Sequence, residues 1–304
     1  MMPTKRGSIR LFRFAGIDLY LHWSWFLVAV YEINQRRTNY SSLAWNVVEY
    51  LALFGIILFH EFGHSLACRQ VGGKADQIVL WPLGGVAYVS PPPRPGATLW
   101  SIAAGPLVNV ALAPVLTLMV VIGKAGWAEA TPNAYALVRA VCFINYALLI
   151  FNLLPIYPLD GGQMVRALLW FALGRARSLM VSVFIGFAGV AGLVVLAVFL
   201  KSFWIAVVAV FILLNCWRGL AQARLLARAA KLPRREGFAC PGCKEPPIRG
   251  ALWRCAKCLK PFDTFESMAS CPHCGTAFPV TQCFECGNAF PIRDWVVPVP
   301  ASST

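Results

Sequence analysis

Long apolar stretches separated by short polar ones dominate the pattern of this chain. Stretches of about 20 residues with almost no charge are long enough to cross the roughly 30 Å core of a bilayer as helices. Five apolar stretches predict membrane-spanning helices at about 43–68, 98–122, 135–154, 179–200 and 203–216. A sixth, about 19–33, carries tryptophan and tyrosine residues that suit a membrane interface. The pattern therefore predicts a mainly α membrane protein with six transmembrane helices.

Two shorter segments have strand-like patterns. Residues 8–21 form two β-prone runs around Ala15-Gly16, and residues 77–96 place strand-like residues on both sides of Gly84-Gly85 before a proline cluster. The second segment is too short and too interrupted to span. We expect a small membrane-associated β-hairpin or sheet, buried in protein or lining a wet cavity.

Composition agrees with a multi-spanning membrane protein, because 58% of residues are hydrophobic and only 13% are charged, where a soluble domain carries about 25%. The net charge of +14 comes mostly from basic residues beside one end of the expected spans. This bias predicts a cell-membrane protein with both termini in the cytoplasm. The first stretch lacks a small-x-small cleavage site, so we expect an uncleaved span. Nucleic acid is not favoured as a partner.

The second expected span ends in the sequence HEFGH. His60 and His64, one helical turn apart on one face, can hold a single zinc ion, and Glu61 is placed to act as general base. Asp160, in the stretch NLLPIYPLDGG from Asn152 to Gly162, is the candidate third ligand, because a charged carboxylate near membrane depth needs a cation. The alternative role of Asp160 is a helix N-cap.

These residues carry a resemblance to a known family. HEFGH on a membrane helix, GGVA at 84–87, AAGPLVN ending at Asn109 and NLLPIYPLDGG resemble the site-2 protease family of intramembrane zinc metalloproteases, over roughly residues 8–220 and closest to its compact prokaryotic branch. The resemblance implies that His60, His64 and Asp160 bind zinc, that Glu61 is the catalytic base and that Asn152 positions substrate or the oxyanion. No inserted PDZ-like domain and no paired nucleotide-binding modules are recognisable.

The mechanism expected of such a site gives the second strand-like segment a role. A substrate helix must be unwound before its peptide bond can be attacked, and the edge of the 77–90 hairpin could pair with it as an added strand. Gly84 and Gly85 would allow close approach of the two backbones, as a substrate-binding element.

Near the C-terminus, eight of the 11 cysteines stand in four CxxC motifs separated by 11, 12 and 8 residues. In a reducing cytoplasm this pattern indicates two structural four-cysteine zinc sites, of the zinc-ribbon type. Pairing of consecutive motifs is favoured over a crossed arrangement, and His273 is not expected to be a ligand. The cysteines are Cys240, Cys243, Cys255, Cys258, Cys271, Cys274, Cys283 and Cys286. A protein partner is favoured for this tail.

Three other polar or thiol groups have structural interpretations. Asn109 is expected to bond a neighbouring helix, Glu49 to lie at the outer membrane interface, and the three isolated cysteines to pack as apolar groups.

The sequence thus predicts three regions: a six-span metalloprotease domain (1–220), a basic linker helix (221–236) and tandem zinc ribbons (237–304). The expected function is metal-dependent cleavage of membrane-anchored proteins within the bilayer, with one catalytic and two structural zinc ions. The alternative is a catalytically silent scaffold that binds partners through its spans and ribbons. A metal transporter is disfavoured, since acidic and histidine residues do not recur along the spans.

Overall fold

The computed structural model describes residues 7–35, 39–81, 84–286 and 288–297. The chain divides into two compact units, a helical one that ends at Ala221 and a cysteine-rich one that begins at Gln222 and also includes Pro92–Arg94. Each unit is described separately below.

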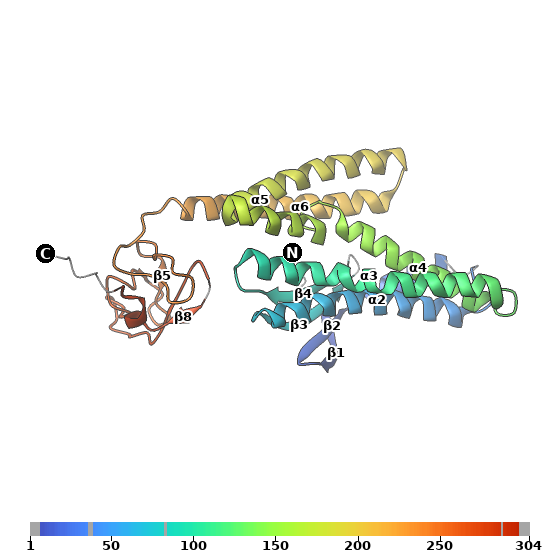
Figure 1. Ribbon diagram of the computed structural model, residues 1–304, viewed down its shortest axis with the longest axis horizontal. Helices are drawn as coiled ribbons and strands as arrows, with labels where there is room; N and C mark the ends of the chain where they lie inside the picture. Colours follow the sequence, from blue (N-terminus) through green and yellow to red (C-terminus); the bar gives the residue numbers. More distant parts are fainter. Residues whose placement is uncertain (1–6, 36–38, 82–83, 287, 298–304) are drawn as a thin grey trace. The chain divides into compact units, whose positions relative to one another are not determined.

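Five helices of the described chain are long and apolar enough to cross a membrane (Figure 1). Lengths of 22 to 40 residues correspond to roughly 33–60 Å, so each exceeds the hydrocarbon thickness of a bilayer. This finding confirms the prediction of an integral, multi-pass membrane protein. The helices are α2 (Leu43–Gln70), α3 (Pro95–Gly126), α4 (Pro132–Leu153), α5 (Asp160–Phe199) and α6 (Phe203–Ala229).

The first expected span, residues 19–33, does not form one long helix. Its beginning belongs to strand β2 (Ile17–His22), and its remainder to the 12-residue helix α1 (Ser24–Gln35). Leu19 is fully buried and lies opposite Ile78 in a neighbouring strand, so strand pairing takes the residues that a spanning helix would need. Five candidate spans, rather than six, are therefore present in the described ranges.

The two strand-like segments come together in one four-stranded sheet. Its order is β1 (Ser8–Phe14), β2, β3 (Lys74–Trp81) and β4 (Gly84–Ser90), with β2 and β3 parallel and the other pairs antiparallel. The expected hairpin and sheet are thus confirmed as a small mixed sheet, and β4 forms one of its edges.

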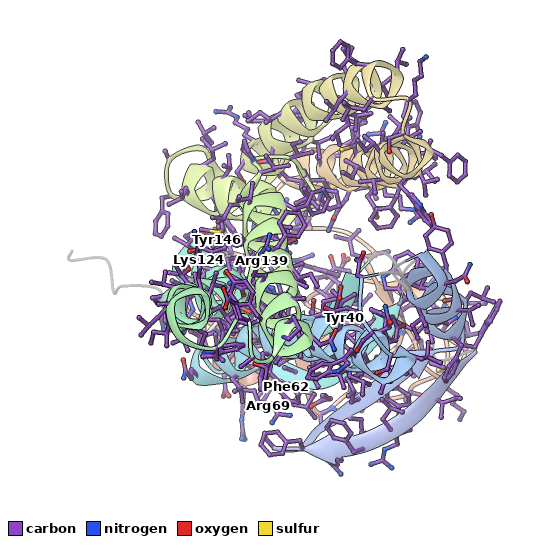
Figure 2. The ribbon with its side chains drawn as sticks, turned by 90° about the vertical axis from the view of Figure 1, so that its right-hand side faces the viewer. Tyr40, Phe62, Arg69, Lys124, Arg139 and Tyr146 are labelled. Atoms are coloured by element: carbon purple, nitrogen blue, oxygen red, sulfur yellow. The ribbon has the colours of Figure 1, made fainter. Side chains whose placement is uncertain are left out.

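The sheet is fixed to the C-terminal half of α2. Ile78 and Leu80 are fully buried and pack with Ile57 and Phe62 of α2 in one apolar cluster. At the end of α2, Arg69 donates hydrogen bonds to the carbonyls of Ala15, Gly16 and Ala75, and Figure 2 labels Phe62 and Arg69 on this helix. The sheet is therefore held beside the helix segment that carries HEFGH.

Helices α2, α3 and α4 pack closely along their lengths. Gly63 of α2 lies against the backbone of Ala104 in α3, where a Cβ would approach the carbonyl oxygen to 2.6 Å. Asn109 of α3 donates to Asn145 Oδ1 at 2.9 Å, and Asn145 donates back to the Asn109 carbonyl at 3.0 Å. The expected helix-to-helix hydrogen bond of Asn109 is thus confirmed.

Helix α5 changes direction at Gly174, whose φ of 76° lies outside the helical region. Glycine adopts this conformation without the steric cost of a Cβ. The kink separates a short helix after Asp160 from the membrane-spanning part that follows.

After the end of α6, the described residues of the cysteine-rich unit form short elements. Strand β5 (Trp253–Arg254) pairs with β6 (Pro261–Phe262), β7 (Thr281–Gln282) pairs with β8 (Ala289–Phe290), and a 3₁₀ helix covers Ile292–Trp295. The buried side chains of its two clusters are cysteines and a few aromatic residues.

An ion pair joins the segment before the first CxxC motif to the residue that follows β6. Arg235 contacts Asp263 at 2.6 Å, and Asp263 also accepts the Gly250 N–H at 2.9 Å. Burial alone would raise the pKa of Asp263, but the hydrogen bonds from Gly250 and Arg235 hold it below its usual value.

Candidate active site and metal centres

Three donor atoms meet between α2 and the start of α5. His60 Nε2 and His64 Nε2 lie 3.0 and 3.3 Å from Asp160 Oδ2, and 3.1 Å from each other. HEFGH presents both rings on one face of α2, and the turn after Pro158 starts α5 at Asp160. The structure thus brings together the three residues that the sequence nominated as ligands.

The hydrogen bonds behind the two rings determine where their lone pairs point. The Ser101 carbonyl can only accept, so His64 Nδ1 carries the proton of that 2.9 Å contact. The backbone carbonyl of Asn109 likewise accepts from the Asn145 amide, which fixes the orientation of that amide. Asn145 Oδ1 then accepts from the Asn109 NH₂ group. Asn109 Oδ1 is therefore the acceptor for His60 Nδ1, at 2.6 Å. Both Nε2 atoms therefore direct lone pairs at each other and at a carboxylate.

Such an arrangement of lone pairs is repulsive unless a cation lies between them. A tetrahedral zinc ion with bonds of about 2.0–2.1 Å would separate its ligands by roughly 3.3–3.4 Å, close to the observed distances. Two neutral imidazoles and one carboxylate, with a further position left for water, are a common donor set of catalytic zinc. The residues present fit this ion on chemistry and on geometry.

Glu61 points toward the sheet. Its Oε2 accepts the Ala87 N–H of β4 at 2.8 Å, and the side chain is only 6% exposed. Gly85 of the same strand lies so close that an added Cβ would overlap the Glu61 carboxylate. The edge of β4 and the carboxylate next to the metal ligands are therefore in direct contact.

Sequence reasoning missed the supports of the two histidines. Ser101 offers only a backbone carbonyl, and Gly105 offers space, since a Cβ there would overlap the His64 ring. The stretch AAGPLVN, which contains Gly105 and Asn109, is part of the family resemblance. That resemblance is the sequence signal that could have pointed to these supports of the histidines. The Ala87 contact with Glu61 has no side-chain signature.

The structure leaves two predicted site residues without a direct contact to the donors. Asn152 lies in the last turn of α4, is half-buried, and makes no hydrogen bond to the three ligands or Glu61 within the described ranges. Gly84 begins β4 with a φ of 133°, a conformation that suits glycine.

In the cysteine-rich unit, the eight CxxC cysteines form two groups of four. Cys240 Sγ lies 3.6 Å from Cys286 Sγ, and Cys243 Sγ lies 3.7 Å from Cys283 Sγ. The expectation that consecutive motifs pair is therefore wrong, because the first motif joins the fourth.

The inner group is made by the second and third motifs. Cys255 and Cys258 meet Cys274 and Cys271 at 3.6 and 3.7 Å, so the inner site is enclosed by the outer one along the chain. Four thiolates around zinc, at about 2.3 Å each, would lie roughly 3.8 Å apart. Both groups fit that ion.

At Cys274 of the inner group, local hydrogen bonds favour the thiolate that a metal requires. The Thr276 hydroxyl and backbone hydrogen bonds lower the pKa of Cys274 to about 6. His273 instead lies near the Pro261 carbonyl, at 3.4 Å, and is not in either group.

Comparisons with known proteins point to one family. The sequence profile of peptidase family M50 matches residues 48–134 and 118–196. A zinc metalloprotease of Methanocaldococcus jannaschii is 35% identical over 179 residues, which is 59% of this chain and 50% of that protein. The stage IV sporulation protein FB of Bacillus subtilis is 31% identical over 117 residues, 38% of each chain.

A solved structure extends the similarity to the fold. A site-2 protease from Methanocaldococcus jannaschii has a TM-score of 0.51 and 28% sequence identity, and the match covers 70% of this chain and 95% of that one. By contrast, the chain spans 50% or less of the length of the curated relatives that it matches.

Proposed function

Because this chain belongs to peptidase family M50, the site-2 protease family, we propose that it is an intramembrane zinc metalloendopeptidase. Its substrates are membrane-anchored proteins, cleaved in or near their transmembrane segments. One observation carries the proposal. Two histidines and an aspartate converge with cation-demanding geometry on apolar helices, and Glu61 lies one residue from His60.

The residues take the following roles. His60, His64 and Asp160 hold zinc, which would polarise the scissile carbonyl and make water a nucleophile near neutral pH. Glu61 takes the proton of the attacking water and passes it to the leaving amine. Asn109 and the Ser101 carbonyl keep the proton on Nδ1 of each histidine, so that both Nε2 atoms face the ion.

The edge of β4 would receive the unwound substrate. Gly84 and Gly85 permit the close approach of a second backbone, and the contact between Ala87 and Glu61 places the base at this edge. An added strand would therefore lie beside the base. Asn152 is proposed to position the substrate or the oxyanion, with the half-buried last turn of α4 as its support.

Orientation and domain organisation are part of the proposal. Both termini and the ribbons lie in the cytoplasm, with residues 1–220 as the protease, 221–236 as a linker helix and 237–304 as tandem ribbons. Each ribbon site holds one structural zinc ion, and the ribbons bind a protein partner. The alternative, a silent scaffold, is less well supported, since all three ligands and the base are in place.

Zinc stoichiometry of the purified full chain tests the metal sites. Wild type is expected to hold three zinc ions, and His60→Ala/Asp160→Ala two, with the ribbons as the internal control. Cleavage of a membrane-anchored substrate by wild type but not by Glu61→Gln then tests catalysis. Wild type with two zinc ions, unchanged by the double substitution, would favour the scaffold. A third ion without any cleavage would do the same.

A further inference from the structure

Strand β1 exposes an unusual number of large apolar side chains. It is an edge strand of the sheet among the described residues, and each of its residues from Ile9 to Phe14 is exposed. The exposed fractions of Ile9, Phe12 and Phe14 are 55%, 45% and 62%. Several such side chains on one short strand indicate a surface that has a partner outside the chain.

The pairing register divides the side chains of β1 between two faces, because directly opposite residues of an antiparallel pair point to the same face. The β2 residues that pack toward α2 are Ile17, Leu19 and Leu21, and their partners in β1 are Phe14, Phe12 and Ile9. Arg10 and Arg13 lie opposite Tyr20 and Asp18, and so point to the other face. Strand β1 is therefore amphipathic, with one apolar face and one basic face.

The hairpin of β1 and β2 is attached to the end of a candidate membrane span. Arg69, the only arginine or lysine of α2, donates hydrogen bonds to the carbonyls of Ala15 and Gly16 at the turn of the hairpin. The Phe14 ring meets the Phe62 ring edge to face, with centroids 5.6 Å apart. From there the two strands run across the direction of the helices rather than along it (Figure 1, Figure 2). The hairpin therefore lies along the plane in which α2 leaves the membrane.

Two opposing requirements place β1 at the boundary between lipid and water. An open strand edge is excluded from the hydrocarbon, since its N–H and C=O groups would have no partners there. In water alone, the apolar face would remain hydrated at a cost in free energy. At the boundary, the apolar side chains reach the acyl chains while the backbone and the arginines stay among headgroups and water.

The basic face determines which headgroups suit it. Arg10 and Arg13 share one carboxylate, that of Asp18, at 2.7 and 3.8 Å, and both arginine side chains are more than half exposed. Two cations against one carboxylate leave one net positive charge, which favours anionic lipid. A second protein strand is a less suitable occupant. Basic side chains on an edge strand, and the pairing irregularity between Arg10 and Phe12, both discourage strand addition.

We infer that β1 binds the bilayer surface beside the end of α2, with its apolar side chains among the acyl chains and with Arg10 and Arg13 on anionic phospholipid headgroups. The inference does not depend on the proposed protease function. Because β1 and β4 belong to one sheet, this contact also fixes the depth at which the edge of β4 lies in the membrane.

Fluorescence quenching tests the position of the apolar face. The full chain, in lipid nanodiscs that leave both membrane faces open to the solution, carries a fluorescent amino acid in place of Phe12, of Phe184 in α5 or of Phe284 in the cysteine-rich unit. These three side chains are exposed to similar extents. We expect Phe12 to be quenched by phospholipids brominated near the headgroup, Phe184 by phospholipids brominated near the chain ends, and Phe284 by iodide in water. Iodide quenching at Phe12 as strong as at Phe284, deep quenching as at Phe184, or protection from every quencher, which a second protein would produce, overturns the inference.

Lipid selectivity at the same label tests the role of charge. Quenching at Phe12 by a brominated anionic phospholipid is compared with quenching by a brominated zwitterionic one, each diluted in unbrominated zwitterionic lipid. We expect an effective preference of about fivefold for the anionic lipid, the effect of one net positive charge near the surface.

Three variants give this preference a sign. Arg10→Gln/Arg13→Gln should abolish it, and Asp18→Asn, which removes the shared carboxylate, should increase it. Arg224→Gln/Arg228→Gln, at two exposed arginines of α6, is the matched control and should keep it. Equal quenching by the two lipids in the unsubstituted chain, or a preference that survives Arg10→Gln/Arg13→Gln, overturns the inference.

Discussion

At the scale of single residues, the site depends on groups that hold the ligands as much as on the ligands. Asn109 joins His60 to Asn145, so one amide serves both the metal site and the packing of α3 against α4. Its two roles can be separated, because the Asn145 side chain hydrogen-bonds Asn109 and, among the described residues, makes no hydrogen bond to the histidine.

Replacement of Asn109 by leucine should weaken zinc binding at the membrane site by roughly 10- to 100-fold, the usual cost of losing such a partner. Competition with a chelator of known affinity measures the change. Asn145→Leu removes the helix-to-helix bonds but leaves the His60 partner, so it should affect zinc binding far less. Equal losses in both variants would mean that Asn109 acts through packing alone.

Substitutions at two glycines distinguish loss of zinc from loss of the general base. Gly105→Ala would push the His64 ring out of position, whereas Gly85→Ala would displace only the Glu61 carboxylate. The first should lose both the membrane-site zinc and cleavage. The second should keep three zinc ions and lose cleavage by at least 100-fold, the order expected for a displaced general base.

Gly55→Ala is the matched control on α2, because no atom lies within 4 Å of the added Cβ. It should retain both zinc and activity. Full activity in Gly85→Ala would contradict the assignment of Glu61 as the base, given how closely the two residues approach.

At this scale the sequence predicted the metal ligands better than the groups that hold those ligands in position. Histidine and aspartate are rare in apolar spans, so their positions were conspicuous, and the motif spacing assigned them. Ser101 and Ala87 act through backbone atoms, which every residue possesses. The burial of Glu49 has a related cause, because it depends on Tyr40, which only the fold brings near, and its place at the membrane interface stays a prediction.

At the scale of elements, strand addition at the edge of β4 predicts an effect at every second residue of the substrate. Successive N–H groups of a strand point to opposite sides, and the Ala87 N–H faces outward, toward Glu61. If the substrate adds as a strand to β4, proline substitutions in the substrate should block cleavage at alternate positions, where an N–H is needed. The intervening positions should tolerate proline.

This scan is read from initial cleavage rates of a series of single-proline substrates. A uniform effect along the segment, or a smooth decline with distance from the scissile bond, would contradict strand addition. Proline destabilises substrate helices at every position, so unwinding alone cannot produce alternation.

The nested cysteine pairing is the second prediction at this scale. Cys240→Ser/Cys283→Ser damages one group only, so the chain should retain two of three zinc ions. Cys240→Ser/Cys255→Ser damages both groups and should leave one. Consecutive pairing demands the reverse result, and metal analysis of the two proteins distinguishes these outcomes. Sequence spacing could not decide this, because all three loops are long enough for either arrangement.

At the scale of the whole molecule, the parallel pairing of β2 with β3 constrains the topology. Both strands belong to one sheet at the Arg69 end of α2, yet α2 starts about 42 Å away along its axis. The chain between β2 and α2 must therefore return along this length. Within the described ranges, the helical part of this connection is the 12-residue α1. Composition alone suggested a sixth full span because the apolar stretch continues from β2 into α1.

We therefore expect the connection through α1 to make a sixth crossing, which places both termini on one side of the membrane. Epitope tags at residue 1 and after residue 304 should be protected or exposed together in sealed cells. A tag inserted at 128–129, between α3 and α4, should show the opposite accessibility. Termini on different sides would require five crossings. The basic residues near 5–13 and 218–235 would then face opposite compartments, against the charge bias that the sequence carries.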